Sequence, residues 1–252
     1  MTTDRIELEF GIPIPGEVLE PEEWASTALK KLPPAGPIDW TAIFDRAAPL
    51  VVDLGCGNGR FLLASAIAHP DWNHVGVDFL PVVLRYATRR ANHRGLSNIR
   101  FAAVDGHQLV SKYLADASVR EIHCYHPQPY HERHQMGRRL LAPRFFAELT
   151  RVLEPGGTFI VQTDNAAYWK YIVAIAPAFF DFSEPTQPWP DAPAGRTRRE
   201  ILARRRNLTI HRGVGIVKPM TFADAQALAA TLPLPTFHAG RPVRGLDDEE
   251  RE

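Results

Sequence analysis

The stretch 49–60, which reads PLVVDLGCGNGR, constrains the fold of this chain more than any other. Residues 50–54 are apolar except for Asp53, a composition typical of a buried parallel strand, and the apolar run that starts at Phe61 indicates a helix. The glycine-rich bend between them places backbone N–H groups and the positive end of a helix dipole beside a site that is clear of side chains. The stretch therefore predicts a turn that binds a small or flat part of a ligand.

The glycine spacing in this turn leaves the type of ligand open. Gly55, Gly57 and Gly59 follow the pattern G-x-G-x-G, which is one residue short of the usual dinucleotide fingerprint, and no Gly-Lys-Ser/Thr ending of a phosphate loop follows. A nicotinamide- or flavin-binding fold with a degenerate fingerprint is one explanation of this turn. The residues farther along the chain show whether a dinucleotide-binding fold is the better explanation.

Length and charge limit the class of protein. A chain of 252 residues suits one α/β domain with additions. Its 29 basic and 29 acidic residues give no net attraction to polyanions, so any contact with nucleic acid has to come from local clusters of Arg and Lys. The two cysteines form no CxxC pair, the N-terminus is polar, and no apolar run reaches about 18 residues. These features predict a reduced, cytoplasmic protein with no membrane span.

The chain divides into three predicted parts. Residues 1–37 are rich in proline and form an N-terminal arm with one short amphipathic helix at 21–32. Residues 38–219 form the main domain, and residues 220–252 add a helix and a charged tail. Within the main domain strands and helices alternate. Strands are expected at 50–54, 74–78, 99–104, 119–125, 158–163 and 208–217. Helices are expected at 58–68, at 81–94, from 138 or 140 to about 153, and at 166–176.

Acidic residues stand at the ends of the predicted strands. Asp53, Asp78 and Asp105 lie at or near the carboxyl ends of three successive strands, the edge at which open α/β sheets bind ligands. Asp164 ends a later strand and belongs to the same edge. Asp78 lies about 20 residues past the glycine turn, where a carboxylate can accept both hydroxyl protons of a ribose. Capping of the helix that starts near residue 80 is the alternative role for Asp78.

A GCGNG turn with acids at three strand ends resembles the cofactor site of class I S-adenosylmethionine-dependent methyltransferases. A ribose diol, an adenine amino group and a methionine ammonium all need oxygen acceptors, whereas the pyrophosphate of a dinucleotide does not. The resemblance implies S-adenosyl-L-methionine as the cofactor. It also implies a Rossmann-like α/β fold, with a mostly parallel seven-stranded sheet, helices on both faces and an antiparallel last strand.

The same resemblance assigns the cofactor contacts. It implies that Asp78 holds the ribose, that Asp105 binds the adenine amino group, and that Asp53 orients the turn or binds the ammonium through water. The full set of expected cofactor-binding residues is Asp53, Gly55, Gly57, Gly59, Asp78, Phe79, Asp105, Gly106 and Gln128.

The second half of the chain resembles a family with a defined substrate. Residues 126–146, HPQPYHERHQMGRRLLAPRFF, are similar to the segment FPDPWxKxRHxKRRLxxxxF of bacterial tRNA (guanine-N7)-methyltransferases. Residues 163–168, TDNAAY, are similar to the TDxxxY of that family, and residues 196–200, RTRRE, to its RPxTxxExR. Over residues 51–217 the resemblance implies an enzyme, with tRNA as its partner, that methylates guanine N7 at variable-loop position 46.

The resemblance also assigns the substrate contacts. Asp164, Thr197 and Glu200 are expected to meet the Watson–Crick edge of guanine, because a carboxylate is the natural acceptor for N1–H and N2–H₂. Gln128 and Asp164 are the expected catalytic residues, and N7 needs alignment without deprotonation because it carries a lone pair and no proton. The expected substrate-binding residues are Glu132, Arg138, Arg139, Asp164, Thr197 and Glu200, and Arg196, Arg198 and Arg199 add positive charge for phosphates.

Positions 128, 130 and 132 depart from the family pattern. Gln128 stands where the family has the aspartate of PDPW, Tyr130 replaces the tryptophan, and Glu132 stands where the family usually has lysine. A neutral amide stabilises the positive charge that develops on the base during methyl transfer less than a carboxylate does. Either another acid compensates, or the chain is slow, altered in substrate or inactive.

Several alternatives stay open. One is a divergent methyltransferase that acts on another RNA or on a small molecule, and another is a non-catalytic RNA-binding paralogue that keeps the cofactor. A metal is not expected, since loop histidines at irregular spacing are common by accident. The histidines concerned are His123, His126, His131 and His134. The sequence does not distinguish a monomer from a homodimer.

Overall fold

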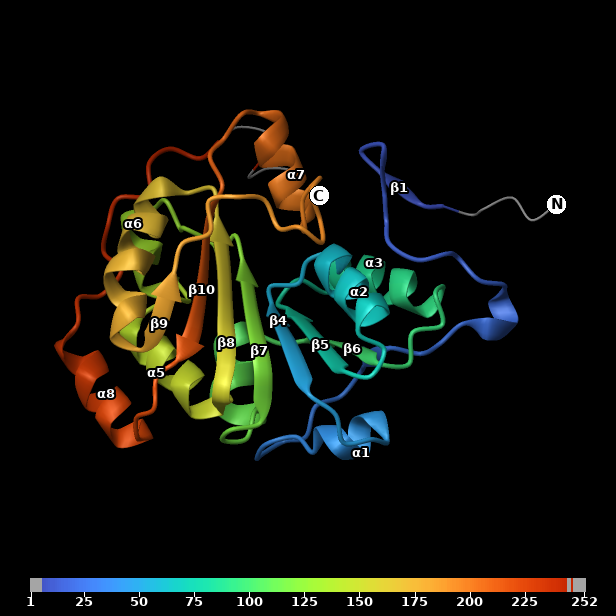
Figure 1. The fold of residues 1–252 in the computed structure, drawn as a ribbon, viewed down its shortest axis with the longest axis horizontal. Coiled ribbons are helices and arrows are strands. Elements are labelled where there is room, and N and C mark those ends of the chain that lie inside the picture. Colours follow the sequence, from blue (N-terminus) through green and yellow to red (C-terminus); the bar gives the residue numbers. More distant parts are fainter. Residues whose placement is uncertain (1–5, 244–245, 247–252) are drawn as a thin grey trace.

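An eight-stranded sheet forms the core of the computed structural model, which describes residues 6–243 and Leu246 (Figure 1). Its strand order is β3-β6-β5-β4-β7-β8-β10-β9, and all neighbours pair in parallel except β10, which is antiparallel to β8 and β9. The strands are β3 Ala28–Leu29, β4 Leu50–Leu54, β5 Asn73–Asp78, β6 Ile99–Ala103, β7 Val119–Tyr125, β8 Leu153–Thr163, β9 Phe180–Ser183 and β10 His211–Val217, and a separate hairpin pairs β1 Leu8–Glu9 with β2 Ile12–Pro13. The expected Rossmann-like α/β fold with an antiparallel last strand is confirmed.

Helices cover both faces of this sheet. They are α1 Trp40–Phe44, α2 Arg60–Ala68, α3 Pro81–Asn92, α4 Gly106–Gln108, α5 Pro143–Val152, α6 Ala166–Ile175, α7 Arg198–Arg205 and α8 Phe222–Thr231. Side chains of the fully buried strand β4 alternate between two apolar clusters: Val51 packs in the cluster of α2 and α3, whereas Val52 and Leu54 pack in that of α1 and α5. This alternation produces the layered fold, because a strand that is apolar on both sides needs helices on both sides.

The path of the chain through the sheet creates a switch point beside β4. From β4 the chain continues to β5 and β6 on one side, and it then crosses to β7 and β8 on the other side. Open α/β sheets bind ligands at such a switch point, outside the carboxyl ends of the strands. The glycine turn after β4 and residues 126–130 after β7 therefore both follow the strands that border this point.

The prediction of an amphipathic helix at 21–32 is wrong. Only Pro21–Glu23 forms a 3₁₀ turn, and the next residues form the edge strand β3, so the sheet has eight strands instead of seven. Thr27 holds the extended path: its N–H and hydroxyl donate to the side chain of Asn92, at 2.9 and 2.8 Å, and its carbonyl accepts from the N–H of Phe101. Tertiary hydrogen bonds to α3 and β6 therefore outweigh the helical spacing of the apolar residues.

The helix expected at 138–153 starts later than predicted. Its first residue is Pro143, a residue favoured at the first helical position, and it ends at Val152. The preceding segment forms a 3₁₀ turn over Arg133–Arg138 and becomes extended at Arg139. The remaining expected helices and strands of the main domain are present within a few residues of their predicted bounds.

The helix expected near residues 223–232 is present as α8 and packs against α5. The charged tail predicted after it falls mostly on residues 244–245 and 247–252, which lie outside the described residues. Across residues 6–243, none of the helices combines the length and the apolar character that a membrane crossing requires. The division into arm, main domain and tail stays a prediction.

Candidate active site

The glycine turn after β4 leaves open space beside its backbone. Gly55 and Gly57 have φ values of 76° and 52°, in the left-handed region that favours glycine, and a Cβ at either position would meet no atom within 4 Å. Gly59 also has a positive φ, but there a Cβ would lie 2.9 Å from the Cβ of Ala87 in α3. Gly55 and Gly57 therefore suit the close approach of a ligand, whereas Gly59 serves the packing of α2 against α3.

Asp53 is a buried acid in β4, only 2 % exposed. Its Oδ1 atom has no hydrogen-bond partner among the described residues. Burial, with a smaller contribution from the charge of Asp78, raises the pKa of this carboxyl to about 8. A buried polar atom without a partner is costly unless a donor or a cation comes to it. This atom therefore fits the ammonium contact expected for Asp53.

Asp78 ends β5 and holds the glycine turn in place. Its Oδ2 accepts from the N–H of Gly57 at 3.1 Å, and its Oδ1 accepts from the N–H of Leu80 at 2.9 Å. Burial raises the pKa of this carboxyl, and the backbone hydrogen bonds partly offset that effect. The alternative role as N-cap of the next helix is wrong, because the N-cap of α3 is Leu80 and no side chain caps this helix. Each oxygen still has a second lone pair, so a ribose contact is compatible with this geometry.

The other residues expected near the adenosine are exposed at the same edge of the sheet. Phe79 is 55 % exposed, which leaves a flat apolar face in solvent. The exposed Asp105 caps α4, with Oδ1 accepting from the N–H groups of His107 and Gln108 at 2.8 and 3.2 Å. Gly106 is the first residue of α4. The adenine contacts of these residues stay predictions.

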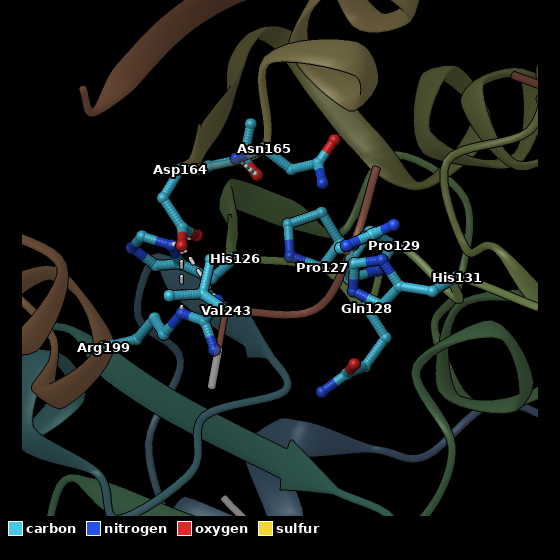
Figure 2. Close-up of a pocket in the computed structure, with 11 residues that line it drawn as sticks. His126, Pro127, Gln128, Pro129, His131, Asp164, Asn165, Arg199 and Val243 are labelled. Atoms are coloured by element: carbon cyan, nitrogen blue, oxygen red, sulfur yellow. Dashed lines mark hydrogen bonds and ion pairs between the residues drawn. The ribbon is translucent and has the colours of Figure 1, made fainter. Parts of the chain in front are cut away.

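A pocket lies at the carboxyl ends of β7 and β8 (Figure 2). It is lined by His126, Pro127, Gln128, Pro129, His131, Thr163, Asp164, Asn165, Arg199, Arg241 and Val243. The structure thus brings together Gln128 and Asp164, the two residues expected to be catalytic. Figure 2 shows Asp164, His126 and Arg199 pointing toward one another, while the side chain of Gln128 extends away from them.

Two neighbours hold the carboxylate of Asp164. Its Oδ1 lies 2.8 Å from Nδ1 of His126, and its Oδ2 accepts from Nη2 of Arg199 at 2.8 Å. Burial raises the pKa of this carboxyl, but the hydrogen bonds from His126 and Arg199 and the charge of Arg199 outweigh burial and hold the pKa well below its usual range. Asp164 is therefore an ionised acceptor in the pocket.

A buried polar chain stands behind His126. Its Nε2 lies 3.0 Å from the amide nitrogen of Gln162, whose Oε1 accepts from the indole N–H of Trp189 at 2.7 Å. The same amide nitrogen donates to Glu200 at 3.1 Å. Sequence reasoning gave no such role to His126, Gln162 or Trp189. The one sequence feature that could have indicated this chain is Gln162, a polar amide directly after the apolar run 159–161 of a predicted strand.

Thr197 and Glu200 form the start of α7. Thr197 caps the helix, with Oγ1 accepting from the N–H of Glu200 at 3.0 Å. Glu200 is fully buried, and its carboxylate accepts from Arg212 at 2.6 Å and from the backbone N–H of Arg196 at 2.9 Å. Contact between Glu200 and a guanine would require α7 to move, because no part of this side chain reaches the surface. The substrate roles expected for Thr197 and Glu200 stay predictions.

Several arginines expected to bind phosphate are engaged within the protein. Arg139 is 2 % exposed, and its guanidinium donates to the carbonyl oxygens of Pro129, Tyr130, Pro235 and Phe237. Arg196 and Arg199 pair with carboxylates of the same chain. A phosphate contact by these three side chains would require existing bonds to break, and it stays a prediction. Arg138 and Glu132 are exposed, so both can reach a substrate without such a change.

Three of the histidines considered as metal ligands have separate partners. His123 lies against Tyr125 and Glu121, His126 against Asp164 and Gln162, and His131 against the carbonyl of Gly240. In the part of the chain that the structure describes, no group of three or more His, Cys, Asp or Glu side chains is arranged to hold a metal ion.

Comparisons with known proteins identify the family. The sequence profile of a family described as "Putative methyltransferase" matches residues 47–218. The tRNA (guanine-N(7)-)-methyltransferase of Halorhodospira halophila is 30 % identical to this chain over 194 residues, which are 75 % of this chain and 84 % of that protein. The protein of the same name from Sodalis glossinidius is 31 % identical, over 64 % of this chain and 69 % of its own length. The chain belongs to the tRNA (guanine-N7)-methyltransferase family.

Another relative and two solved structures complete the comparison. The tRNA (guanine-N(7)-)-methyltransferase of Saccharophagus degradans is 32 % identical, but the match spans only 62 % of that protein. The 16S rRNA methyltransferase KamB superposes with a TM-score of 0.55 at 18 % identity, over 77 % of this chain and 99 % of that one. The 16S rRNA (adenine(1408)-N(1))-methyltransferase of Catenulisporales acidiphilia, solved with SAM, has a TM-score of 0.52 at 20 % identity, over 79 % and 99 %. These solved structures show the fold alone.

As a member of the tRNA (guanine-N7)-methyltransferase family, the protein is a methyltransferase whose departures from the family pattern gather at or beside one pocket. Gln128 lines the pocket and is exposed. The ring of Tyr130 lies 4.9 Å from the guanidinium carbon of Arg138, so an aromatic surface is kept where the family has tryptophan. Glu132 is exposed just before the 3₁₀ turn. The residues expected to bind the cofactor keep the glycines and acids of the family pattern.

Proposed function

We propose that the protein transfers a methyl group from S-adenosyl-L-methionine to N7 of guanine in tRNA, at variable-loop position 46. The observation that carries this proposal is the pairing of two sites that follow neighbouring strands, β4 and β7. The first has an open glycine backbone and an unpaired carboxyl oxygen, Oδ1 of Asp53. The second holds the ionised Asp164. The names of the relatives support tRNA as the substrate, and a tRNA substrate is consistent with a cytoplasmic enzyme.

The residues of the glycine turn support S-adenosyl-L-methionine as the methyl donor. The backbone at Gly55 and Gly57 has room for a nucleoside, and Asp78 has lone pairs for a ribose diol. The unpaired Oδ1 of Asp53 suits the positive ammonium of a methionine. When bound, this cofactor supplies a methyl group activated by the sulfonium charge.

For this reaction the protein has to align guanine N7 with the methyl group and to stabilise the charge that develops on the base. Guanine N7 carries an in-plane lone pair and no proton, so no base has to act before the transfer. Positive charge then grows on the base, and in this proposal the ionised Asp164 accepts from an N–H group of the base and stabilises that charge. Gln128 adds an amide to the same pocket, and the exposed Arg138 offers a contact for phosphate.

A methylation assay with a defined tRNA tests the proposal. An unmodified transcript is incubated with the protein and S-adenosyl-L-methionine, and its nucleosides are then measured by mass spectrometry. We expect 7-methylguanosine, and none from a transcript in which guanosine 46 is replaced by adenosine. Asp78→Asn should bind the cofactor roughly tenfold more weakly, because it removes a charged acceptor. Cofactor binding by calorimetry without any 7-methylguanosine would contradict the substrate assignment.

Gln128 favours a second candidate function, methylation of another RNA or of a small molecule. A neutral amide in the pocket gives the base less electrostatic help than the aspartate of the family. The same assay on total RNA distinguishes the two functions. Methylation of tRNA that appears only in Gln128→Asp would favour the second function, and tight cofactor binding without any product would indicate a non-catalytic paralogue.

A further inference from the structure

His126 and Gln128 both depart from the family segment FPDPW. His126 stands where that segment has phenylalanine, and Gln128 stands where it has aspartate. Both line one pocket, and among the described residues that line it Asp164 is the one carboxylate. The acid at position 128 is thus absent from this chain, and the new histidine contacts the acid that remains.

Hydrogen bonds decide which ring nitrogen of His126 carries the proton. The indole N–H of Trp189 can only donate, and its bond to Oε1 of Gln162, at 2.7 Å, sets the orientation of the amide. The amide nitrogen of Gln162 then donates to Nε2 of His126 at 3.0 Å. Because Nε2 accepts, the ring proton is on Nδ1, which points at Oδ1 of Asp164, 2.8 Å away.

The hydrogen-bonded chain from Trp189 through Gln162 to His126 is buried, and each polar group of the Gln162 amide has a partner. Trp189 is 8 % exposed and Gln162 is not exposed at all, while the side chains of His126 and Asp164 are 4 % and 6 % exposed. Gln162 donates its other amide hydrogen to Glu200 at 3.1 Å. A buried network whose groups are all satisfied holds its members in one arrangement. The ring of His126 therefore cannot turn without the loss of two hydrogen bonds.

We propose that His126 is a positioning residue for methyl transfer: its Nδ1–H holds the Asp164 carboxylate in the pocket as the acceptor for the substrate base, in place of the acid missing at position 128. This inference rests on the proposed function, since it concerns the same pocket and the same base. Arg199 binds the other oxygen of Asp164, so both carboxylate oxygens have a fixed place. Oδ2 accepts from both Nη2 and Nε of Arg199, at 2.8 and 3.3 Å, whereas Oδ1 keeps a second lone pair for a substrate N–H group.

Two substitutions of His126 separate positioning from packing. His126→Asn keeps an N–H donor at the δ position, whereas His126→Phe fills the space with the family residue and donates nothing. For His126→Phe we expect kcat of tRNA methylation to fall roughly tenfold to a hundredfold, with KM for the cofactor unchanged. For His126→Asn the loss should be about threefold or less. Equal losses in the two variants, or full activity of His126→Phe, would overturn the proposal.

The double variant His126→Phe/Gln128→Asp restores the family residues at both positions. If His126 serves in place of the missing acid, the double variant should recover most of the kcat lost in His126→Phe. Gln128→Asp in the wild-type background should then give a smaller gain, because Asp164 is already held there. Strictly additive effects of the two substitutions would contradict the proposed exchange of roles.

Nitrogen-15 NMR of the imidazole rings provides a readout that does not depend on activity. In the wild-type protein at neutral pH we expect the proton of His126 on Nδ1. Trp189→Phe removes the donor that orients Gln162, so this variant should show a mixture of the two tautomers. A proton on Nε2 in the wild type would overturn the inference. The expected tautomer combined with no methylation of tRNA would contradict the proposed function instead.

Discussion

Arg138 and Arg139 are neighbours in the chain with opposite surroundings. Arg139 is buried and donates to the carbonyl of Pro129 at 2.6 Å and to those of Pro235 and Phe237 at 2.6 and 2.7 Å. Its guanidinium carbon also lies 3.8 Å from the centre of the Phe237 ring. Arg138 is exposed. Arg139 therefore ties the segment after β7 to the C-terminal part of the chain, and Arg138 faces solvent.

We expect Arg139→Met to lower the free energy of unfolding by about 3 kcal/mol or more, because four carbonyl groups lose a charged donor. Arg138→Met, the matched control, should change it by less than about 0.5 kcal/mol and should instead weaken tRNA binding. Urea unfolding and an RNA-binding assay on both variants measure these effects. Equal losses of stability would contradict the different roles of the two side chains.

Residues of the site were predictable where their chemistry is local. Gly57 and Asp53 follow from one strand–turn–helix pattern, and Asp164 from its place at the end of a strand. Arg139 could not be placed in this way. Two of its acceptors lie 96 and 98 positions along the chain, so its burial depends on packing between distant segments.

At the scale of elements, the hairpin of β1 and β2 supports the glycine turn. Glu9 is 9 % exposed and accepts from the side-chain amide of Asn58 in the turn at 2.7 Å. Its carboxylate also pairs with Arg60 at 3.5 Å and Arg90 at 3.2 Å, at the start of α2 and along α3. The hairpin is therefore part of the structure that holds the glycine turn, α2 and α3 together.

The tip of the same hairpin reaches α7. The ring centre of Phe10 lies 4.9 Å from the guanidinium carbon of Arg198 and 5.3 Å from that of Arg205, both in α7. Arg205 also donates to the carbonyl of Phe10. One short hairpin thus connects the glycine turn to α7, whose N-cap is Thr197, a residue expected to contact the substrate.

We expect Glu9→Gln to lower the free energy of unfolding by about 2 kcal/mol, because buried arginines lose their counter-charge. The affinity for S-adenosyl-L-methionine should also fall, since Asn58 is then held less firmly. Glu22→Gln, in the exposed turn of the same arm, is the control and should change neither quantity. Thermal unfolding and calorimetry of the two variants measure these effects. Wild-type behaviour of Glu9→Gln would show that the hairpin is not needed by the turn.

Regular elements were easier to predict than this arm. Strand β7 has its predicted bounds, and α2, α3 and α6 differ from theirs by at most a few residues, because each carries a sufficiently long apolar pattern. Strands of two residues carry no such pattern. The edge strand β3 exists because Thr27 and the residues after it find partners on α3 and β6.

At the scale of the whole molecule, buried titratable groups link stability to pH. The pKa of Asp53 is raised from 3.8 to about 8, so in this range the folded protein holds a proton that the unfolded chain releases, and the contribution of this group falls as pH rises. His74 acts in the opposite direction: burial lowers its pKa from 6.5 to about 4, so its contribution is lost as pH falls below 6.5. The range from pH 6.5 to pH 8 therefore separates the effect of Asp53 from that of His74.

We expect the free energy of unfolding to fall by about 1–2 kcal/mol between pH 6.5 and pH 8. Asp53→Asn cannot ionise and should show a flatter profile over the same range. S-adenosyl-L-methionine should reduce the fall in the wild type, since a nearby cation favours the ionised carboxylate. Urea unfolding at constant ionic strength measures all three profiles. A wild-type profile that rises over this range would contradict the raised pKa of Asp53.

Local sequence was sufficient for the α/β fold, for the glycine turn and for the acids at the strand ends, because each depends on residues within one strand–turn–helix unit. Tertiary packing determined which polar groups are buried with partners inside the protein and which stay accessible to a ligand. Glu200 and Arg139 are buried by segments far from them in the chain, and the proton position on His126 depends on Gln162, 36 residues later. Burial and hydrogen-bond partners arise from contacts between distant segments, and no local pattern carries that information.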